Sequence, residues 1–438
     1  MTTSALENAL ILANRVQDIS GYEYTLEAFT AKFRDGHVGA YLMRGSQTEE
    51  RQYEWPGFVM AWRSHQGIVH SALDEQADLV NAEVISCDNR PIREVVLTNA
   101  FRFGGNPSVP GDWIESSPEV FIDGGNPFIN RPEQCTFLLP NGVQDERKLQ
   151  WSSISEPELV ERYLLMTDGP AGSPSLEIFG ESRYWISVAT LWPNNTELTQ
   201  LEMLIHQIED QRASLQNADT IVFDLRRATG GSSVWMTRIA NALWGETYVN
   251  SQSSDLSTYT EYRASQGNLE HLKTLLNEPS LVNAPANVFQ FFTETVDGIE
   301  QAYIRDEPLY STKNNPSYRA ETVSANSNDI SNPVSAKIYV FMTGLCGSAC
   351  LDAVDLLSQF DNVTLVGMPT SADTDYLEIR DVVLPSERAI LRFPIKVYRD
   401  RNRPSNFYYE PEILYSDLDL SRAAVESWLT DLINENAD

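Results

Sequence analysis

Apolar side chains recur at helical spacing near the start of the chain. They repeat every three to four positions from about Ser4 to Phe33, and an Asp-Gly turn signal at residue 35 interrupts them. Residues 38–42 then look extended. The pattern predicts an N-terminal helical segment over residues 1–56.

Short apolar runs separated by turn signals follow, which is typical of a β-rich domain. The runs are residues 58–62, 83–87, 92–96 and 136–139, the last of which ends in the hairpin signal Pro140-Asn141-Gly142. Residues 101–130 are rich in glycine and proline and predict an inserted loop. We therefore predict a β-rich domain over residues 57–155 with an insertion at about 101–130.

Apolar strands and amphipathic helices alternate in the remainder of the chain. The predicted strands are residues 185–189, 220–225, 336–342 and 363–367, and the predicted helices are residues 198–215, 234–243 and 351–360. This alternation indicates parallel strands joined by crossover helices. The sequence thus predicts an α/β domain with a mainly parallel sheet over residues 156–438, interrupted by a polar insertion at about 246–332.

Charge and composition exclude some partners. The formal net charge of −30 argues against nucleic acid and anionic membranes, because both require basic patches. Hydrophobic residues make up 42% of the chain, and no apolar run approaches the roughly 20 residues of a membrane span. No signal-peptide pattern is visible at the start.

The residues around Ser348 form the first candidate site. A predicted strand runs into Gly344-Leu345-Cys346-Gly347-Ser348, and a helix follows. Free backbone N–H groups at a helix start can stabilise an oxyanion, and Ala349 would supply one of them. The alternative is an ordinary N-cap serine, because serine is a favoured cap.

Two further segments could complete a nucleophilic site. Gly230-Gly231 follows another buried strand, and neither a phosphate-binding loop nor a dinucleotide motif is present, so a second oxyanion donor fits better. His37 is one of five histidines and lies at a glycine-flanked turn, where it could act as a general base. A lone histidine is more often structural, so His37 is a candidate only in combination with Ser348.

These segments together resemble the tail-specific, or C-terminal processing, proteases of peptidase family S41. The matching segments are Asp224-Leu225-Arg226 with Gly230-Gly231, Gly347-Ser348-Ala349, Asp35-Gly36-His37, and residues 84–92, 366–370 and 409–413. The resemblance implies a ClpP/crotonase-like catalytic domain, a PDZ-like domain over residues 57–155, and a serine endopeptidase acting on polypeptides without a metal or cofactor.

The sequence departs from the family in its catalytic base. Many members carry lysine roughly 25 residues after the serine, but residues 370–375 contain none, and the nearest downstream lysine is Lys396. The best parallel is the subgroup typified by the chlamydial protease-like factor, which takes histidine from its N-terminal segment. That parallel implies His37 as base and Glu410 as the carboxylate that orients it. The alternatives for the acid are Glu412, Glu378 and Ser405.

Two questions stay open at this point. A lysine-free member could have lost catalysis and bind peptides or small apolar ligands instead. The four cysteines, Cys87, Cys135, Cys346 and Cys350, permit two disulfides or four buried thiols. Disulfides would favour a periplasmic or secreted location.

Overall fold

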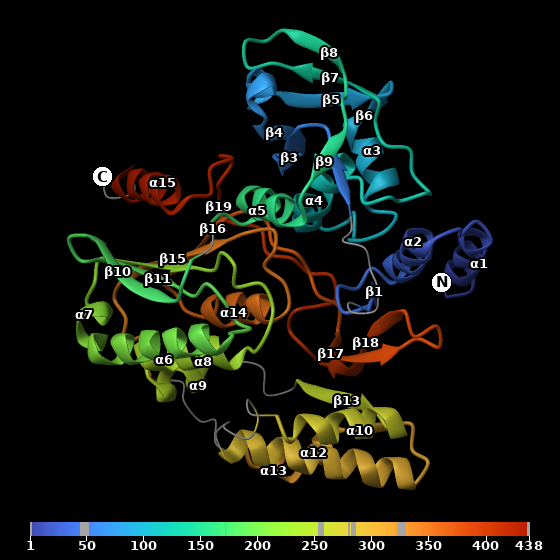
Figure 1. The fold of residues 1–438 in the computed structure, drawn as a ribbon. Coiled ribbons are helices and arrows are strands. Elements are labelled where there is room, and N and C mark those ends of the chain that lie inside the picture. Colours follow the sequence, from blue (N-terminus) through green and yellow to red (C-terminus); the bar gives the residue numbers. More distant parts are fainter. Residues whose placement is uncertain are drawn as a thin grey trace.

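The computed structural model describes residues 2–43, 52–170, 172–252, 258–278, 281, 286–321 and 330–435. Within these ranges it contains three multi-stranded sheets and a two-stranded one (Figure 1). Among the described helices, none is both long and apolar enough to cross a bilayer. The α/β class predicted from the sequence is confirmed.

The central sheet has the strand order β10-β11-β12-β15-β16-β19. The first pair is antiparallel and the other pairs are parallel, with Thr220 opposite Lys337 and Ile338 opposite Val363. The strands are β10 (Ser175–Gly180), β11 (Arg183–Ser187), β12 (Thr220–Asp224), β15 (Lys337–Met342), β16 (Val363–Gly367) and β19 (Ile413–Leu414). Parallel strands place their carboxyl ends at one edge, so the segments after β12 and β15 meet there.

Helices cover both faces of this sheet, which explains why its middle strands β12 and β15 are mainly apolar. Ile221 and Phe223 pack with one set of helices, whereas Val222 between them faces the opposite side and packs with α15 (Arg422–Glu435). The first set consists of α6 (Asn195–Asp210), α7 (Arg212–Gln216), α8 (Val234–Trp244), α9 (Glu246–Gln252) and α14 (Ala349–Leu357). Figure 1 shows α6, α8 and α14 on the side of the sheet opposite α15.

A second sheet joins the N-terminal segment to the C-terminal part of the chain. Strand β1 pairs antiparallel with β18, with Gly39 opposite Arg392, and β18 also pairs with β17 and β13. The strands are β1 (Gly39–Leu42), β13 (Tyr259–Arg263), β14 (Leu309–Ser311), β17 (Tyr376–Val383) and β18 (Ala389–Arg399). This pairing brings the turn before β1 close to the loop before β17.

The third sheet forms the unit predicted to be PDZ-like. It has the order β3-β4-β5-β7-β8, with β6 beside β5, and α5 (Glu156–Thr167) follows it. The strands are β3 (Phe58–Arg63), β4 (Gln66–Ala72), β5 (Glu83–Cys87), β6 (Arg90–Pro91), β7 (Gln134–Leu138) and β8 (Gln144–Lys148), and β2 (Tyr53–Trp55) pairs separately with β9 (Ser152–Ile154).

Two predictions for this unit were wrong. Residues 92–96, read as extended, belong to helix α3 (Ile92–Asn99), because Ile92, Val95 and Val96 occupy one helical face that is buried. The predicted loop at 101–130 contains α4 (Pro110–Ser116) and a 3-10 turn (Ser117–Phe121). Its Trp113 stacks on Trp62 with ring centroids 4.8 Å apart, so the insertion is part of the core.

The N-terminal segment is divided into two helices rather than one. They are α1 (Thr2–Ala13) and α2 (Ile19–Thr30), followed by a 3-10 turn (Ala31–Phe33). Asp18 caps α2 by accepting the Gly21 N–H at 2.8 Å, which explains the break before Ile19. Helix α2 ends a few residues before His37 and the start of β1.

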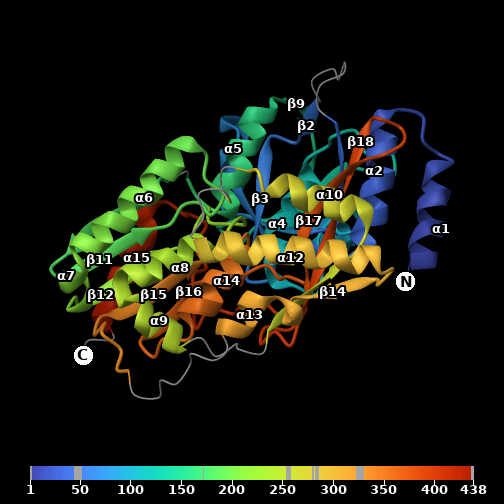
Figure 2. The same ribbon diagram turned by 90° about the horizontal axis from the view of Figure 1, so that it is seen from below.

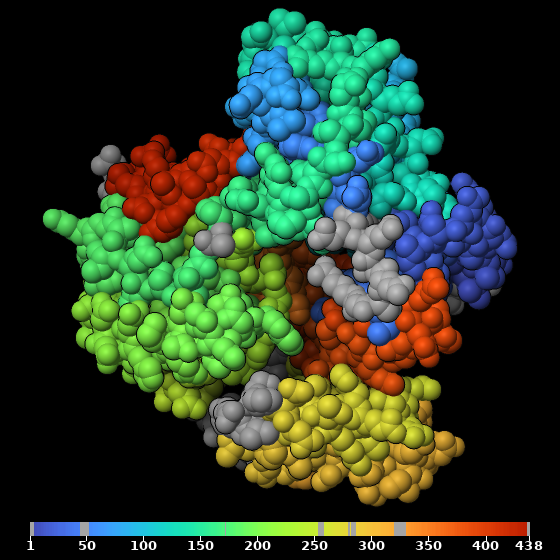
Figure 3. Space-filling model, viewed as in Figure 1, coloured from blue at the N-terminus to red at the C-terminus, as the bar shows by residue number. Residues whose placement is uncertain are grey.

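The predicted polar insertion forms a small helical cap with its own apolar core. Its helices are α10 (Gln266–Leu275), α12 (Ala286–Ile304) and α13 (Pro316–Glu321), and they lie together beside β13 (Figures 1 and 2). Leu272, Val296 and Ile299 are fully buried there. Figure 3 shows the surface hollowed between the green region of α6 and α8, the orange β17–β18 and the blue-green α5.

All four cysteines are paired. Cys87 is bonded to Cys135 across β5 and β7, and Cys346 is bonded to Cys350 across the turn that carries Ser348. The second pair encloses the candidate nucleophile in a five-residue covalent loop.

Candidate active site

Ser348 lies in the sharp turn between β15 and α14. Its φ and ψ are 53° and −121°, a combination that residues with a side chain rarely adopt. The hydroxyl makes no capping hydrogen bond to the helix, so the ordinary N-cap interpretation does not describe it. The turn instead presents the Ser348 hydroxyl, as strained strand-to-helix turns do in α/β-hydrolases.

The Gly230-Gly231 segment lies against this turn. A Cβ atom on Gly230 would lie 3.5 Å from the Ser348 Cβ, and the Cys350 N–H donates to the Thr229 carbonyl at 3.3 Å. Gly231 has φ of 136°, and a Cβ there would lie 2.1 Å from the Leu191 carbonyl oxygen, so only glycine fits. The structure thus brings both segments predicted for the oxyanion site to Ser348.

His37 reaches Ser348 from the other end of the chain. Its Nε2 lies 3.4 Å from Ser348 Oγ, although the residues are 311 positions apart. This distance is slightly longer than an ideal hydrogen bond, as is common in serine hydrolase sites without substrate. The pairing of β1 with β18 holds the His37 turn in this position.

Asp35 is the carboxylate in contact with His37. Its Oδ1 accepts the main-chain N–H of His37 at 2.8 Å and lies 3.4 Å from His37 Nδ1. The Asp35 side chain is only 6% exposed and that of His37 14%. Burial lowers the pKa of His37, but the interaction with Asp35 and the charges of Asp373 and Asp35 outweigh it, so the net shift is upward.

The acids nominated from the sequence lie elsewhere. Glu410 is exposed, and within the described residues no hydrogen bond or ion pair joins it to His37. Glu412 accepts the Leu365 N–H and Glu378 pairs with Lys396. Ser405 bonds to Asp375. The nomination of Glu410 followed motif order, which does not report where a side chain points.

Lys396 cannot replace the family's catalytic lysine as a base. Its Nζ lies 3.3 Å from Glu378 Oε2 on the neighbouring strand. Burial lowers the pKa of Lys396, but Tyr262, Tyr398 and Glu378 raise it by more, and the net pKa lies well above the ordinary value. The ammonium group therefore stays protonated at neutral pH.

The loop before β17 contacts both halves of the site, which the sequence did not predict. Asp373 Oδ1 accepts the Ser348 N–H at 3.0 Å, and Thr374 Oγ1 donates to Asp35 Oδ2 at 2.7 Å. Asp373 lies 25 residues after Ser348, at the spacing where the resemblance to family S41 implies a lysine. The sequence did contain a signal for this contact, namely a charged residue at the spacing where a lysine was expected.

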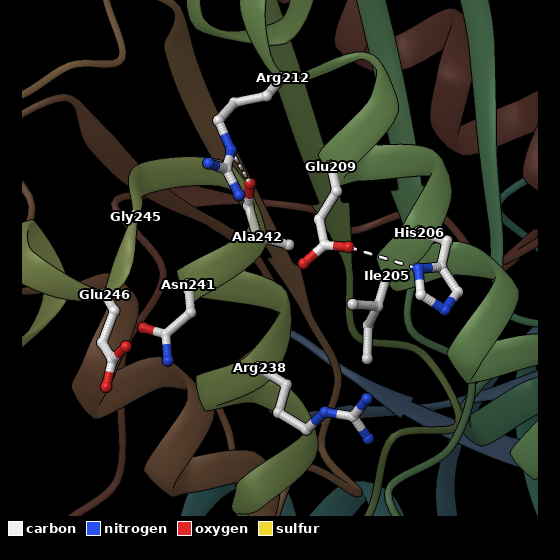
Figure 4. Close-up of a pocket in the computed structure, with 9 residues that line it drawn as sticks. All are labelled: Ile205, His206, Glu209, Arg212, Arg238, Asn241, Ala242, Gly245 and Glu246. Carbon is white, nitrogen blue, oxygen red and sulfur yellow. Dashed lines mark hydrogen bonds and ion pairs between the residues drawn. The ribbon is translucent and has the colours of Figure 1, made fainter.

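A cavity and a groove lie at different distances from Ser348 and His37. A cavity of about 300 Å³ opens beside Asp35 and Ser371, and Asp112 and Glu115 line it as well. A groove of about 410 Å³ lies among α6 to α9 instead, and its polar lining includes the ion pair of His206 with Glu209 (Figure 4). The cavity beside Asp35 is the one that adjoins the Ser348 site.

Comparison with known proteins shows the fold. No family model matches the sequence, and no curated protein matches it either. Mature CPAF in complex with lactacystin aligns over 99% of this chain and 93% of its own, with a TM-score of 0.61 and 13% identity. The chain has a fold similar to that of mature CPAF.

Other solved structures align as well. A second structure of mature CPAF covers 100% of this chain and 92% of its own, with a TM-score of 0.59 and 13% identity. The photosystem II D1 C-terminal processing protease aligns less well, with a TM-score of 0.34 and 10% identity over 92% of this chain and 85% of its own. The CPAF-like fold thus extends over nearly the whole chain.

Proposed function

We propose that this protein is a serine endopeptidase of the processing type, in which Ser348 is the nucleophile and His37 the general base. The distance of 3.4 Å between His37 Nε2 and Ser348 Oγ carries the proposal. A serine hydroxyl needs an adjacent base, and a histidine near neutral pH is suited to that task. The similarity to CPAF supports a protease, and a polypeptide is the substrate.

In this mechanism Ser348 Oγ attacks the scissile carbonyl carbon while His37 Nε2 takes the hydroxyl proton. His37 then gives that proton to the leaving amine, and a water molecule activated by His37 releases the acyl group. Asp35, in place of Glu410, lies 3.4 Å from His37 Nδ1, and its charge stabilises the imidazolium. No step requires a metal or another cofactor.

The oxyanion of the tetrahedral intermediate would be held by backbone N–H groups. Ala349 and Gly230 are the main candidates, because neither N–H donates to an acceptor within the described ranges and Gly230 lies against Ser348. Gly231 supports the segment through its fit against Leu191. Both disulfides support a periplasmic or secreted location, because they persist in oxidising compartments.

Labelling with a fluorophosphonate tests the proposal. Intact mass should show one adduct on the wild-type protein and none on the Ser348→Ala variant. A wild-type protein that stays unlabelled at neutral and alkaline pH, while a reference serine hydrolase reacts, would instead support a non-catalytic protein that binds peptides or small apolar ligands.

The acid of the site is tested by comparing Asp35→Asn with Glu410→Gln. We expect Asp35→Asn to slow labelling by about 100-fold, less than the ~10⁴-fold effect in a Ser-His-Asp triad, because the contact with Nδ1 is long. Glu410→Gln is expected to label at the wild-type rate. The reverse ranking of the two labelling rates would restore Glu410 as the acid.

A further inference from the structure

We propose that Asp373 is a positioning residue of this site: one carboxylate oxygen anchors the Ser348 backbone, and the carboxylate charge stabilises protonated His37. The inference deepens the proposed function and rests on it for its catalytic meaning. Asp373 lies in the loop before β17, distant in sequence from His37.

The contact of Asp373 with the Ser348 backbone stabilises a strained conformation. A non-glycine residue at φ 53° and ψ −121° is strained, and this conformation persists only when its surroundings hold it. The hydrogen bond from the Ser348 N–H to Asp373 Oδ1 satisfies a half-buried donor. On the other side of the Ser348 Cα atom, the Leu351 N–H donates to the Ser348 carbonyl at 3.0 Å.

The charge of Asp373 acts on His37 from outside its own turn. The charged groups that shift the pKa of His37 are Asp35 from the same turn, Asp373 from the loop before β17 and Lys396 from β18. Asp373 contacts the backbone of Ser348, whose Oγ lies 3.4 Å from His37 Nε2. Lys396 opposes the two carboxylates, and Glu378 offsets it in part through their ion pair. Removing the Asp373 charge therefore lowers the pKa of His37.

A buried ion network holds Asp373 in place. Arg403 Nη2 lies 3.5 Å from Asp373 Oδ2, and the two side chains are 3% and 7% exposed. Arg403 also pairs with Asp352 and with Asp355, the latter through Nε at 3.2 Å. Burial raises the pKa of Asp373, whereas Arg403 and His37 lower it, and the net shift is upward. The Asp373 carboxylate is thus buried between the Arg403 guanidinium and the Ser348 backbone N–H.

The test measures His37 directly. The imidazole of His37 is titrated by NMR in wild type, Asp373→Asn and Asp355→Asn, with its signal assigned from His37→Gln. We expect His37 to titrate at lower pH in Asp373→Asn and at the wild-type pH in Asp355→Asn, which weakens the same ion network without touching Ser348 or His37. Coincident titrations in wild type and Asp373→Asn would overturn the electrostatic part of the proposal.

Labelling rates test the backbone contact. Asp373→Asn keeps an acceptor oxygen, so its maximal rate should stay near that of wild type while the acidic limb of its pH profile moves to lower pH. Asp373→Ala loses the acceptor and should be slower by roughly 10–100-fold. Equal maximal rates in these variants would overturn the anchoring role.

Folding and the proposed function are tested separately. If Asp373→Asn does not fold, Asp373→Glu keeps the charge but moves the carboxylate, and a wild-type labelling rate in that variant would contradict the anchoring. If wild-type protein is not labelled, the proposed function fails, whereas the NMR titration still decides whether Asp373 acts on His37.

Discussion

Replacing His37 with alanine is expected to slow fluorophosphonate labelling of Ser348 by on the order of 10⁴-fold or more. Without the imidazole, no described side chain with a suitable pKa lies at Ser348 Oγ to take its proton, because Lys396 stays protonated and bound to Glu378. The second-order rate constant, obtained from intact mass against time, measures the loss.

His206→Ala is the matched control for this change. His206 lies on α6 with a side chain 72% exposed and pairs with Glu209 on the same helix (Figure 4). We expect it to label at the wild-type rate. If His37→Ala also labelled at that rate, the base would have to be another group, and the contact with Ser348 would be structural.

The two disulfides are expected to differ in their effects on stability and activity. Cys87 and Cys135 are 48 positions apart, and replacing both with alanine should lower the free energy of unfolding of their unit by about 4 kcal/mol without slowing labelling. Cys346 and Cys350 are only 4 positions apart, and replacing both should lower the free energy of unfolding by about 2 kcal/mol. The second change should nevertheless slow labelling roughly 10-fold, because it frees the strained Ser348 turn.

Urea unfolding and labelling rates measured on the same samples separate these effects. Each pair serves as the control for the other, since both remove one buried disulfide. Equal labelling rates in the two double variants, at temperatures where both are folded, would show that the disulfide around Ser348 does not hold the turn.

The local pattern of apolar and polar residues was sufficient to predict an element where a single physical cause sets that pattern. Strands β12 and β15 are mainly apolar because helices cover both faces of the central sheet, so they could be read directly from the sequence. Helix α3 could not, because Ile92, Val95 and Val96 suit a short buried strand as well as one face of a helix. Only packing in the core decides between these alternatives.

The site also combines features that the sequence determined with features that only the tertiary structure decided. The sequence by itself determined that Ser348 follows an apolar strand and precedes a helix, and that Gly230-Gly231 follows another, since parallel strands place such turns at one edge. Only the tertiary structure decided which charged groups complete the site. Asp35 lies in the same turn as His37. This turn and Asp373 reach Ser348 through the pairing of β18 with both β1 and β17, whereas Glu410 remains exposed. A period-two strand pattern shows which face is buried but carries no information about the partner strand, so contacts across hundreds of residues depend on the assembled sheet.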